Sequence, residues 1–153
     1  MAELKEGDQA PAFSAKNQNG ESISLNDFAG KTVVLYFYPK DDTPGCTAEA
    51  CNFRDNYQSL LAKGFEIIGV STDDEKSHTK FVNKYQLPFN LIADTDKKIV
   101  EAYGVWVEKS MYGKTYMGTA RKTFIINPEG KIQKIIEKVD TKNSSQQVLD
   151  LLD

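Results

Sequence analysis

Histidine and cysteine are both rare in this sequence, which has one histidine and two cysteines among 153 residues. They could complete a four-ligand structural zinc site only with distant carboxylates, and the chain shows no metal-ligand spacing. The sequence also lacks the Gly-x-Gly-x-x-Gly pattern and the Walker loop, the glycine-rich signatures of dinucleotide and phosphate binding. We therefore expect no metal and no nucleotide cofactor.

Long apolar runs and concentrated positive charge are missing as well. The longest apolar stretch runs from Val33 to Tyr38, far short of the ~18 residues that cross a bilayer. The net charge is −3 and the basic residues are scattered, whereas a nucleic-acid partner would need a basic patch. The N-terminal segment has neither the basic nor the apolar region of a secretory signal. These absences predict a cytoplasmic protein that binds neither membranes nor nucleic acids.

The composition of the chain fits one globular domain. Apolar residues make up 40% and charged residues 27% of its 153 residues, so we expect a single domain over residues 1–153. Strand-like and helix-like segments alternate, which indicates an α/β fold. Near the start, the pair Asn19-Gly20 lies between two short extended segments and favours a tight turn. It predicts an N-terminal β-hairpin.

Hydrophobic periodicity places the remaining elements. A continuous β-branched and aromatic run predicts a buried strand at residues 32–38. Further strands are expected at residues 65–72 and 90–93, and a hairpin across Pro128-Glu129-Gly130 at residues 122–127 and 131–139. Apolar residues at intervals of three and four predict helices at residues 44–61, 75–85, 98–103 and 145–152. This order resembles a thioredoxin-like fold, in which helices flank a central mixed sheet.

The segment that carries the most chemistry spans residues 39–51, PKDDTPGCTAEAC. Thr43 offers a capping hydroxyl and Pro44 suits the first helical position, so Cys46 is expected in the first helical turn. Free backbone N–H groups and the positive end of the helix dipole meet there and favour a thiolate. Gly45 lets the backbone approach a small substrate closely. The Thr43 hydroxyl could donate to the thiolate or accept from a peroxide.

Cys46 alone also fits a simpler interpretation. Free cysteine is among the most buried residue types, and most such thiols are inert. The neighbouring threonine, proline and glycine at a helix start favour a reactive thiol instead. The second cysteine, Cys51, lies five residues further on, and in a reducing compartment such a pair is more typical of redox chemistry than of a permanent disulfide.

The pattern Pro39-x-x-x-Thr43-x-x-Cys46 matches the active-site signature of the peroxiredoxins. The chain resembles the bacterioferritin comigratory protein (peroxiredoxin Q) branch of that family, from residues 36–51 through Gly-Val-Trp at residues 104–106 to Arg121. The resemblance covers nearly the whole chain. It implies an enzyme that reduces hydrogen peroxide or organic hydroperoxides without metal, haem or flavin.

The resemblance also implies a role for each residue of the site. Cys46 would attack the peroxide, Thr43 would hydrogen-bond the sulfur and the peroxide oxygen, and Pro39 would shield the pocket. Arg121 would stabilise the thiolate and the charge of the transition state, where a fixed cation acts most strongly. Glu49 resembles the acid that braces this arginine. For Glu49 an exposed helix-surface glutamate remains the alternative, and for Arg121 a surface ion pair.

Cys51 would be the resolving cysteine, which attacks the Cys46 sulfenic acid to form an intramolecular disulfide. Positions five apart in an intact helix are separated by a rise of about 7.5 Å and by roughly 140° around the axis. A disulfide needs Cα atoms closer than ~7 Å with converging Cβ vectors. We therefore expect local unwinding from Thr43 to about Phe53 during catalysis. The alternative is that Cys51 is a small core residue and the resolving thiol comes from elsewhere.

Two other functions and one other residue need to be considered. A thioredoxin-type disulfide oxidoreductase normally uses Cys-x-x-Cys, a shorter spacing than the one found here. A redox sensor that oxidises without turnover stays open. For an enzyme, the family resemblance implies recycling by thioredoxin or a similar dithiol, and we expect a monomer or a weak dimer. His78 has polar sequence neighbours and is predicted to be a solvated histidine, although histidine is the usual general base.

Overall fold

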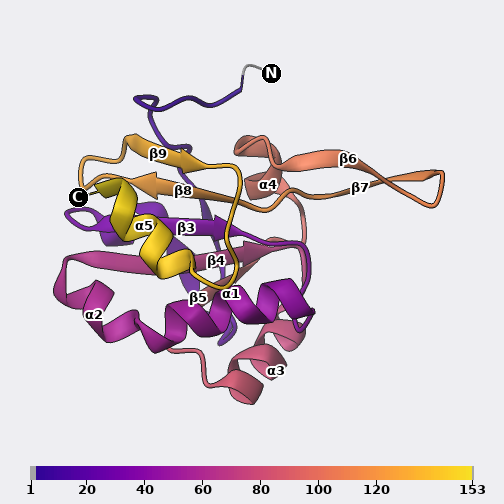
Figure 1. The fold of residues 1–153 in the computed structure, drawn as a ribbon, viewed down its shortest axis with the longest axis horizontal. Helices are drawn as coiled ribbons and strands as arrows, with labels where there is room; N and C mark the ends of the chain where they lie inside the picture. The colour runs from indigo at the N-terminus through magenta and orange to yellow at the C-terminus, as the bar shows by residue number, and fades with distance from the viewer. Residues whose placement is uncertain (1–2, 153) are drawn as a thin grey trace.

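A five-stranded mixed sheet forms the centre of the computed structural model, which describes residues 3–152 (Figure 1). From edge to edge its strands are β5 (Asn90–Ala93), β4 (Phe65–Ser71), β3 (Thr32–Phe37), β8 (Lys122–Ile126) and β9 (Ile132–Ile136). β3, β4 and β5 are parallel to one another, whereas β8 runs antiparallel to β3 and to β9. The sequence predicts a single domain over residues 1–153, and residues 1, 2 and 153 of it lie outside the residues that the structure describes.

Two separate hairpins and six helices make up the rest of the regular structure within residues 3–152. The hairpins are β1 (Ser14–Lys16) with β2 (Ser22–Ser24), and β6 (Trp106–Met111) with β7 (Lys114–Thr119). The helices are the 3-10 helix η1 (Leu25–Phe28) and α1 (Pro44–Asp55), α2 (Tyr57–Ala62), α3 (Glu75–Tyr85), α4 (Lys98–Ala102) and α5 (Ser144–Leu152). The β6–β7 hairpin extends away from the sheet (Figure 1).

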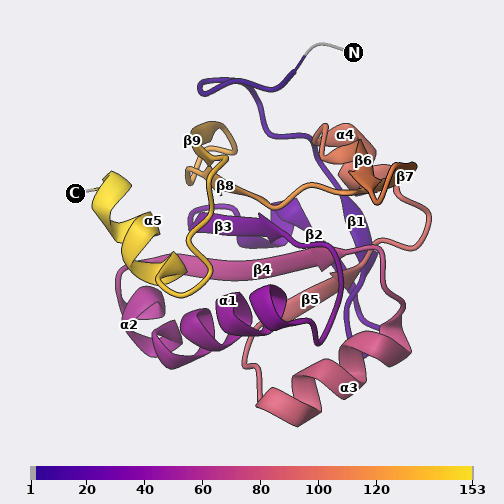
Figure 2. The ribbon, with the colours of Figure 1, turned by 45° about the vertical axis from the view of Figure 1, so that its right-hand side comes forward.

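β3 divides the core into two halves because successive side chains of a strand point to opposite faces. Leu35 and Phe37 belong to one buried cluster, which also includes residues of α4. Val34 and Tyr36 belong to the other cluster. α1, α2, α3 and α5 contribute to that second cluster and cover its face of the sheet (Figure 2). Cys46 lies in this second half of the core.

The structure confirms the predicted architecture, a mixed sheet flanked by helices with an N-terminal hairpin. α3 and β5 have the predicted bounds, and the other predicted strands and helices are found with shifted ends. The predicted helix over residues 44–61 is instead two helices. The chain breaks at Asn56, whose side chain donates to the carbonyl of Asn52 and competes with the helical pattern.

The β6–β7 hairpin was not predicted. Its turn places both Tyr112 (φ 52°) and Gly113 (φ 78°) in the left-handed region, the requirement of a type I′ two-residue turn. Asparagine and aspartate commonly take the first of these positions, and tyrosine does so rarely. The residues of the hairpin that flank this turn are mostly exposed and lack the apolar alternation that marks a half-buried strand. Within residues 3–152, the helices are too short or too polar to span a bilayer.

Candidate active site

Cys46 lies in the first turn of α1, directly after the loop that leaves β3. Pro44 is the first residue of α1, as the sequence predicts, and Thr43 stands at the N-cap position in an extended conformation. The predicted capping bond from the Thr43 hydroxyl is not made, because this hydroxyl donates to the carbonyl of Lys40. The first bond of the helix runs from the Thr47 N–H to the Thr43 carbonyl at 2.8 Å. Helix geometry therefore leaves the N–H groups of Gly45 and Cys46 without intrahelical partners beside a thiol that is 1% exposed. These donors and the helix dipole favour an anion at the sulfur.

Arg121 reaches Cys46 because of the register between β3 and β8. Phe37, the last residue of β3, pairs with Lys122, the first residue of the antiparallel strand β8. Arg121 therefore lies beside the end of β3, where the chain leaves the sheet and continues to α1. Its Nη2 donates to Cys46 Sγ at 3.2 Å. Burial by itself lowers the pKa of Arg121, but the neighbouring Cys46 and Glu49 outweigh it and raise that pKa. A fixed cation at this distance favours the thiolate.

Glu49 lies on the same face of α1 as Cys46, three residues later, and is fully buried. Its Oε1 accepts from Arg121 Nη1 at 3.0 Å, so the guanidinium bridges the sulfur and the carboxyl group. Burial raises the pKa of Glu49 to about 7, against the lowering effect of Arg121 and of the Ser144 hydroxyl. The interpretation of Glu49 as an exposed helix-surface residue is therefore wrong.

Gly45 leaves room for this guanidinium. A Cβ at position 45 would lie 3.2 Å from Arg121 Nη2, so a side chain there would push the cation away from the sulfur. The close approach that the sequence assigns to a substrate is made, in this structure, by the arginine.

Thr43 uses its hydroxyl hydrogen on the loop and not on the sulfur. Its Oγ1 donates to the carbonyl of Lys40 at 2.9 Å. A hydroxyl that donates in this way keeps its lone pairs free. The sequence allowed Thr43 either to donate to the thiolate or to accept from a peroxide, and this arrangement suits acceptance from a peroxide. Pro39 is half-buried at the end of β3.

Cys51 is half-buried and both thiols are free. α1 is continuous from Pro44 to Asp55, so the two cysteines occupy one intact helix. Their separation of five positions corresponds to a rise of about 7.5 Å and roughly 140° around the axis. The structure thus represents a dithiol state in which the two sulfurs point in different directions.

His78 corrects the sequence analysis. It is 0% exposed, not solvated, and its two ring nitrogens lie 2.7 Å from Asp41 Oδ2 and 2.9 Å from the carbonyl of Ile92. The missed signal was periodicity. His78 shares one face of α3 with Phe81, and their spacing of three residues is typical of a buried helix face.

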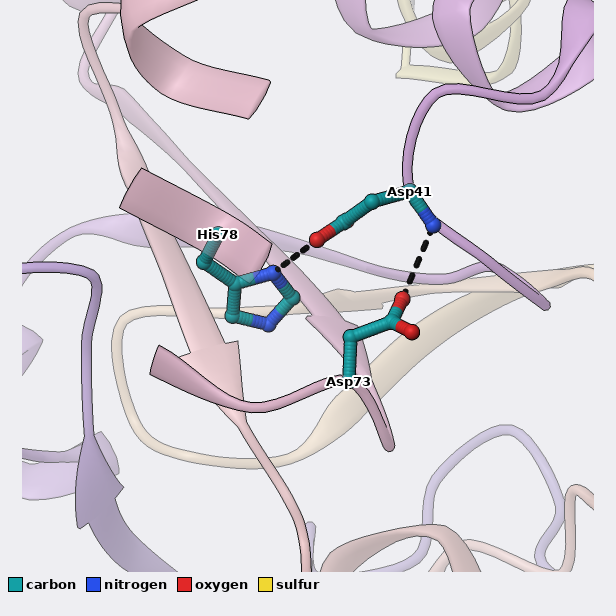
Figure 3. Close-up of side chains that lie close together, drawn as sticks. All are labelled: Asp41, Asp73 and His78. Carbon is teal, nitrogen blue, oxygen red and sulfur yellow. Dashed lines mark hydrogen bonds and ion pairs between the residues drawn. The ribbon is translucent and has the colours of Figure 1, made fainter. Parts of the chain in front are cut away.

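Asp41, in the loop before Cys46, is the centre of a buried hydrogen-bond network that sequence reasoning missed (Figure 3). Its carboxylate accepts from the hydroxyl of Tyr38 at 2.6 Å and of Ser77 at 2.7 Å, besides its contact with His78. Its backbone N–H donates to Asp73 Oδ2 at 2.8 Å. The loop before Cys46 is thereby attached to α3 and to the chain between β4 and α3.

Asp41, Asp73 and His78 have ligand atoms within 4.8 Å of one another, the spacing of a metal site. The nearest atoms are already hydrogen-bonded within the network. Asp41 Oδ2 and His78 Nδ1 face each other, and Asp73 Oδ2 accepts from the Asp41 N–H and the Ser71 hydroxyl. A metal ion would have to break these bonds, so we read the group as a hydrogen-bond network.

Comparison with known proteins extends over nearly the full chain. Residues 6–135 match the AhpC/TSA family. The chain is 47% identical to peroxiredoxin Bcp of Bacillus subtilis over 146 residues, which cover 95% of this chain and 93% of that protein. It is 45% identical to peroxiredoxin Bcp of Escherichia coli over 152 residues, or 99% of this chain and 97% of that one.

Solved structures give the same result. A peroxiredoxin Q from Xylella fastidiosa superposes with a TM-score of 0.93 at 30% identity, over 99% of this chain and 97% of that chain. A peroxiredoxin Q from Xanthomonas campestris superposes with a TM-score of 0.86 at 38% identity, over 92% of this chain and 89% of that chain.

Proposed function

Because this chain belongs to the AhpC/TSA family and is a thiol peroxidase, we propose that Cys46 attacks the peroxide and that Cys51 resolves the product. The observation that carries this assignment is the position of Cys46 Sγ, 3.2 Å from Arg121 Nη2 and in the first turn of α1. A cation and a helix N-terminus both act on the sulfur, and each favours the nucleophilic thiolate.

In the first step the Cys46 thiolate attacks one oxygen of the peroxide. A sulfur–oxygen bond forms, the oxygen–oxygen bond breaks, and a proton completes the departing water or alcohol. Cys46 is left as a sulfenic acid, oxidised by two electrons, while the peroxide is reduced by two. Arg121 faces the developing negative charge and is held in place by Glu49. Thr43 accepts a hydrogen bond from the bound peroxide, and Pro39 limits access of water.

In the second step the Cys51 thiolate attacks the sulfur of the Cys46 sulfenic acid. A disulfide forms and hydroxide leaves, to be protonated to water. An intact α1 separates the two sulfurs, so the helix unwinds from Thr43 to about Phe53 before the bond closes. An external dithiol then reduces the disulfide and is oxidised in turn.

Peroxide substrate and thiol reductant follow from the family. We propose further that the reductant is thioredoxin or a similar dithiol, and that the protein is a single-domain cytoplasmic monomer, at most a weak dimer. The net charge of −3 and the scattered basic residues support the expectation that it has no nucleic-acid partner.

The experiment that tests the assignment measures the intact mass of the reduced protein before and after one equivalent of hydrogen peroxide. Loss of two hydrogens from the monomer is the expected result. Cys51→Ser should instead gain one oxygen, because the first step survives and the second does not. Cys46→Ser should show no change of mass. A covalent dimer of the wild type would move resolution to a second chain and contradict the role of Cys51.

A redox sensor would give the same change of mass, so turnover needs its own assay. With thioredoxin, thioredoxin reductase and NADPH, the wild type should consume many equivalents of peroxide, whereas a sensor would stop near one. Cys46→Ser should consume none above the background.

A further inference from the structure

The loop between β3 and α1 is held on the side that precedes Cys46. The Asp41 side chain is buried, and three side-chain groups contact its carboxylate, from Tyr38, Ser77 and His78. Two of the three come from α3, a helix that contains no residue of the proposed catalytic site. α3 thus supports the loop that leads to the reactive thiol (Figure 3).

The contacts of His78 show that the attachment is specific. The Ile92 carbonyl can only accept a hydrogen bond, so Nε2 must carry a proton. Nδ1 lies 2.7 Å from Asp41 Oδ2 and both side chains are buried, so a hydrogen bond joins the ring to the carboxyl group. Removal of either partner would leave the other buried without its partner, a costly change.

The chain between Asp41 and Cys46 is held less firmly. Pro44 has no N–H group, and the Thr43 side chain does not cap the helix. Arg121 attaches the first turn of α1 to the start of β8 through the thiol and through Glu49. Once that sulfur is oxidised it loses its negative charge, and this contact weakens. The firmly held Asp41 and the weakly held start of α1 are therefore separated by only a few residues.

We propose that Asp41 and His78 are positioning residues that form a fixed anchor for the peroxidatic loop. The anchor keeps Pro39 to Asp42 in place. The start of α1 can then close into the arrangement that reacts with peroxide, and it reopens only beyond Asp42. Neither residue touches the reacting atoms. This inference rests on the proposed function, since it concerns the reaction of Cys46 with peroxide and the disulfide that Cys51 then forms.

The anchor predicts an effect on the first step and none on the second. Loss of the pair should let the loop move, and small displacements of catalytic groups can reduce a rate by about 100-fold. We expect Asp41→Ala and His78→Ala to react with hydrogen peroxide about 10- to 100-fold more slowly than the wild type. Formation of the disulfide from the sulfenic acid should not be slowed, because it requires the open form.

A conservative variant separates positioning from charge. In Asp41→Asn, Oδ1 can still accept from Tyr38. The amide nitrogen can donate to Ser77 and to Nδ1 of a neutral His78, whose Nε2 still donates to Ile92. The network stays complete without the carboxylate, so Asp41→Asn should recover most of the rate lost in Asp41→Ala.

The control is the exposed contact on the same loop. Lys84 Nζ lies 2.8 Å from Asp42 Oδ2, with side chains 58% and 43% exposed. Exposed ion pairs contribute little, so Lys84→Ala should keep the wild-type rate with peroxide.

The test measures both steps by stopped-flow mixing of the reduced protein with hydrogen peroxide, followed by tryptophan fluorescence and quenched intact mass. Folding of each variant is checked by circular dichroism, and Ser77→Ala serves as a milder variant if Asp41→Ala and His78→Ala do not fold. A slower first step with an unchanged second step, and rescue by Asp41→Asn, is the expected result.

Two results would overturn the anchor. The first is wild-type rates in Asp41→Ala and His78→Ala, or in Ser77→Ala where it replaces them. The second is an equal slowing of both steps, which would indicate a general loss of structure. Failure of the wild type itself to form the disulfide would count against the proposed function and not against the anchor.

Discussion

The two helices α1 and α3 each follow a parallel strand of the same sheet, yet their first turns are built differently. At α3 the side chain of Asp74 accepts a hydrogen bond from the N–H of Ser77 at 2.8 Å. At α1 the Thr43 side chain makes no such bond and turns to the carbonyl of Lys40 instead. α3 therefore satisfies a donor at its start, and α1 leaves the donors at its start free.

The difference shows what the chemistry requires of α1. Free N–H groups and a helix dipole stabilise a thiolate, whereas an aspartate cap would place a competing negative charge beside the sulfur. A helix start without a side-chain cap is also easier to unwind, since such a cap is worth about 1 kcal/mol. α3 carries no reacting group. Its capped first turn can therefore support the loop between β3 and α1.

The largest expected effect comes from removing the cation beside the sulfur of Cys46. Arg121→Gln should slow the reaction with hydrogen peroxide by about 100- to 1,000-fold, the range for loss of one preorganised donor. Lys131, an exposed cation directly before β9, gives the matched control Lys131→Gln, which should behave like the wild type. Equal rates for Arg121→Gln and Lys131→Gln would show that the helix start suffices alone.

Glu49 should make stability depend on pH in an unusual direction. Burial raises its pKa from 4.5 to about 7, so the folded protein binds this proton more tightly than the unfolded chain does. Unfolding releases the proton between these two values, and the free energy of unfolding falls as pH rises from about 4.5 to about 7, by roughly 1–3 kcal/mol. Glu49→Gln should lose this part of the slope in urea denaturation at several pH values. An unchanged slope would mean that Glu49 is ionised throughout this range.

The smallest effect should come from α3. Asp74→Ala removes the cap and should lower the free energy of unfolding by about 1 kcal/mol. Chemical denaturation measures that loss, and the rate with peroxide should not change. A large loss of rate would show that the cap of α3 also takes part in holding the loop.

The sequence predicted the start of α1 well because its signals are local. Thr43, Pro44 and the position of Cys46 depend on neighbours along the chain, and so do the bounds of α3. The proximity of Arg121 to Cys46 could be expected only through the family resemblance. It follows from the register of β3 with β8, which no short pattern encodes.

The misses arose where tertiary contacts decide the outcome. His78 has polar neighbours in sequence, and only its spacing to Phe81 indicated the buried face. Its partner Asp41 lies 37 positions away, so nothing local could reveal the pair. The Thr43 hydroxyl had two possible interactions from sequence, and the fold of the loop around Lys40 favoured one.

The most direct test of the account is amide hydrogen exchange in the reduced protein and in the protein oxidised by one equivalent of hydrogen peroxide. We predict that oxidation speeds exchange from Gly45 to about Phe53 and leaves α3 protected, because the helix start unwinds while its support stays closed. Matched exchange rates in the two forms would contradict the unwinding of α1. Faster exchange in α3 as well would contradict the fixed support.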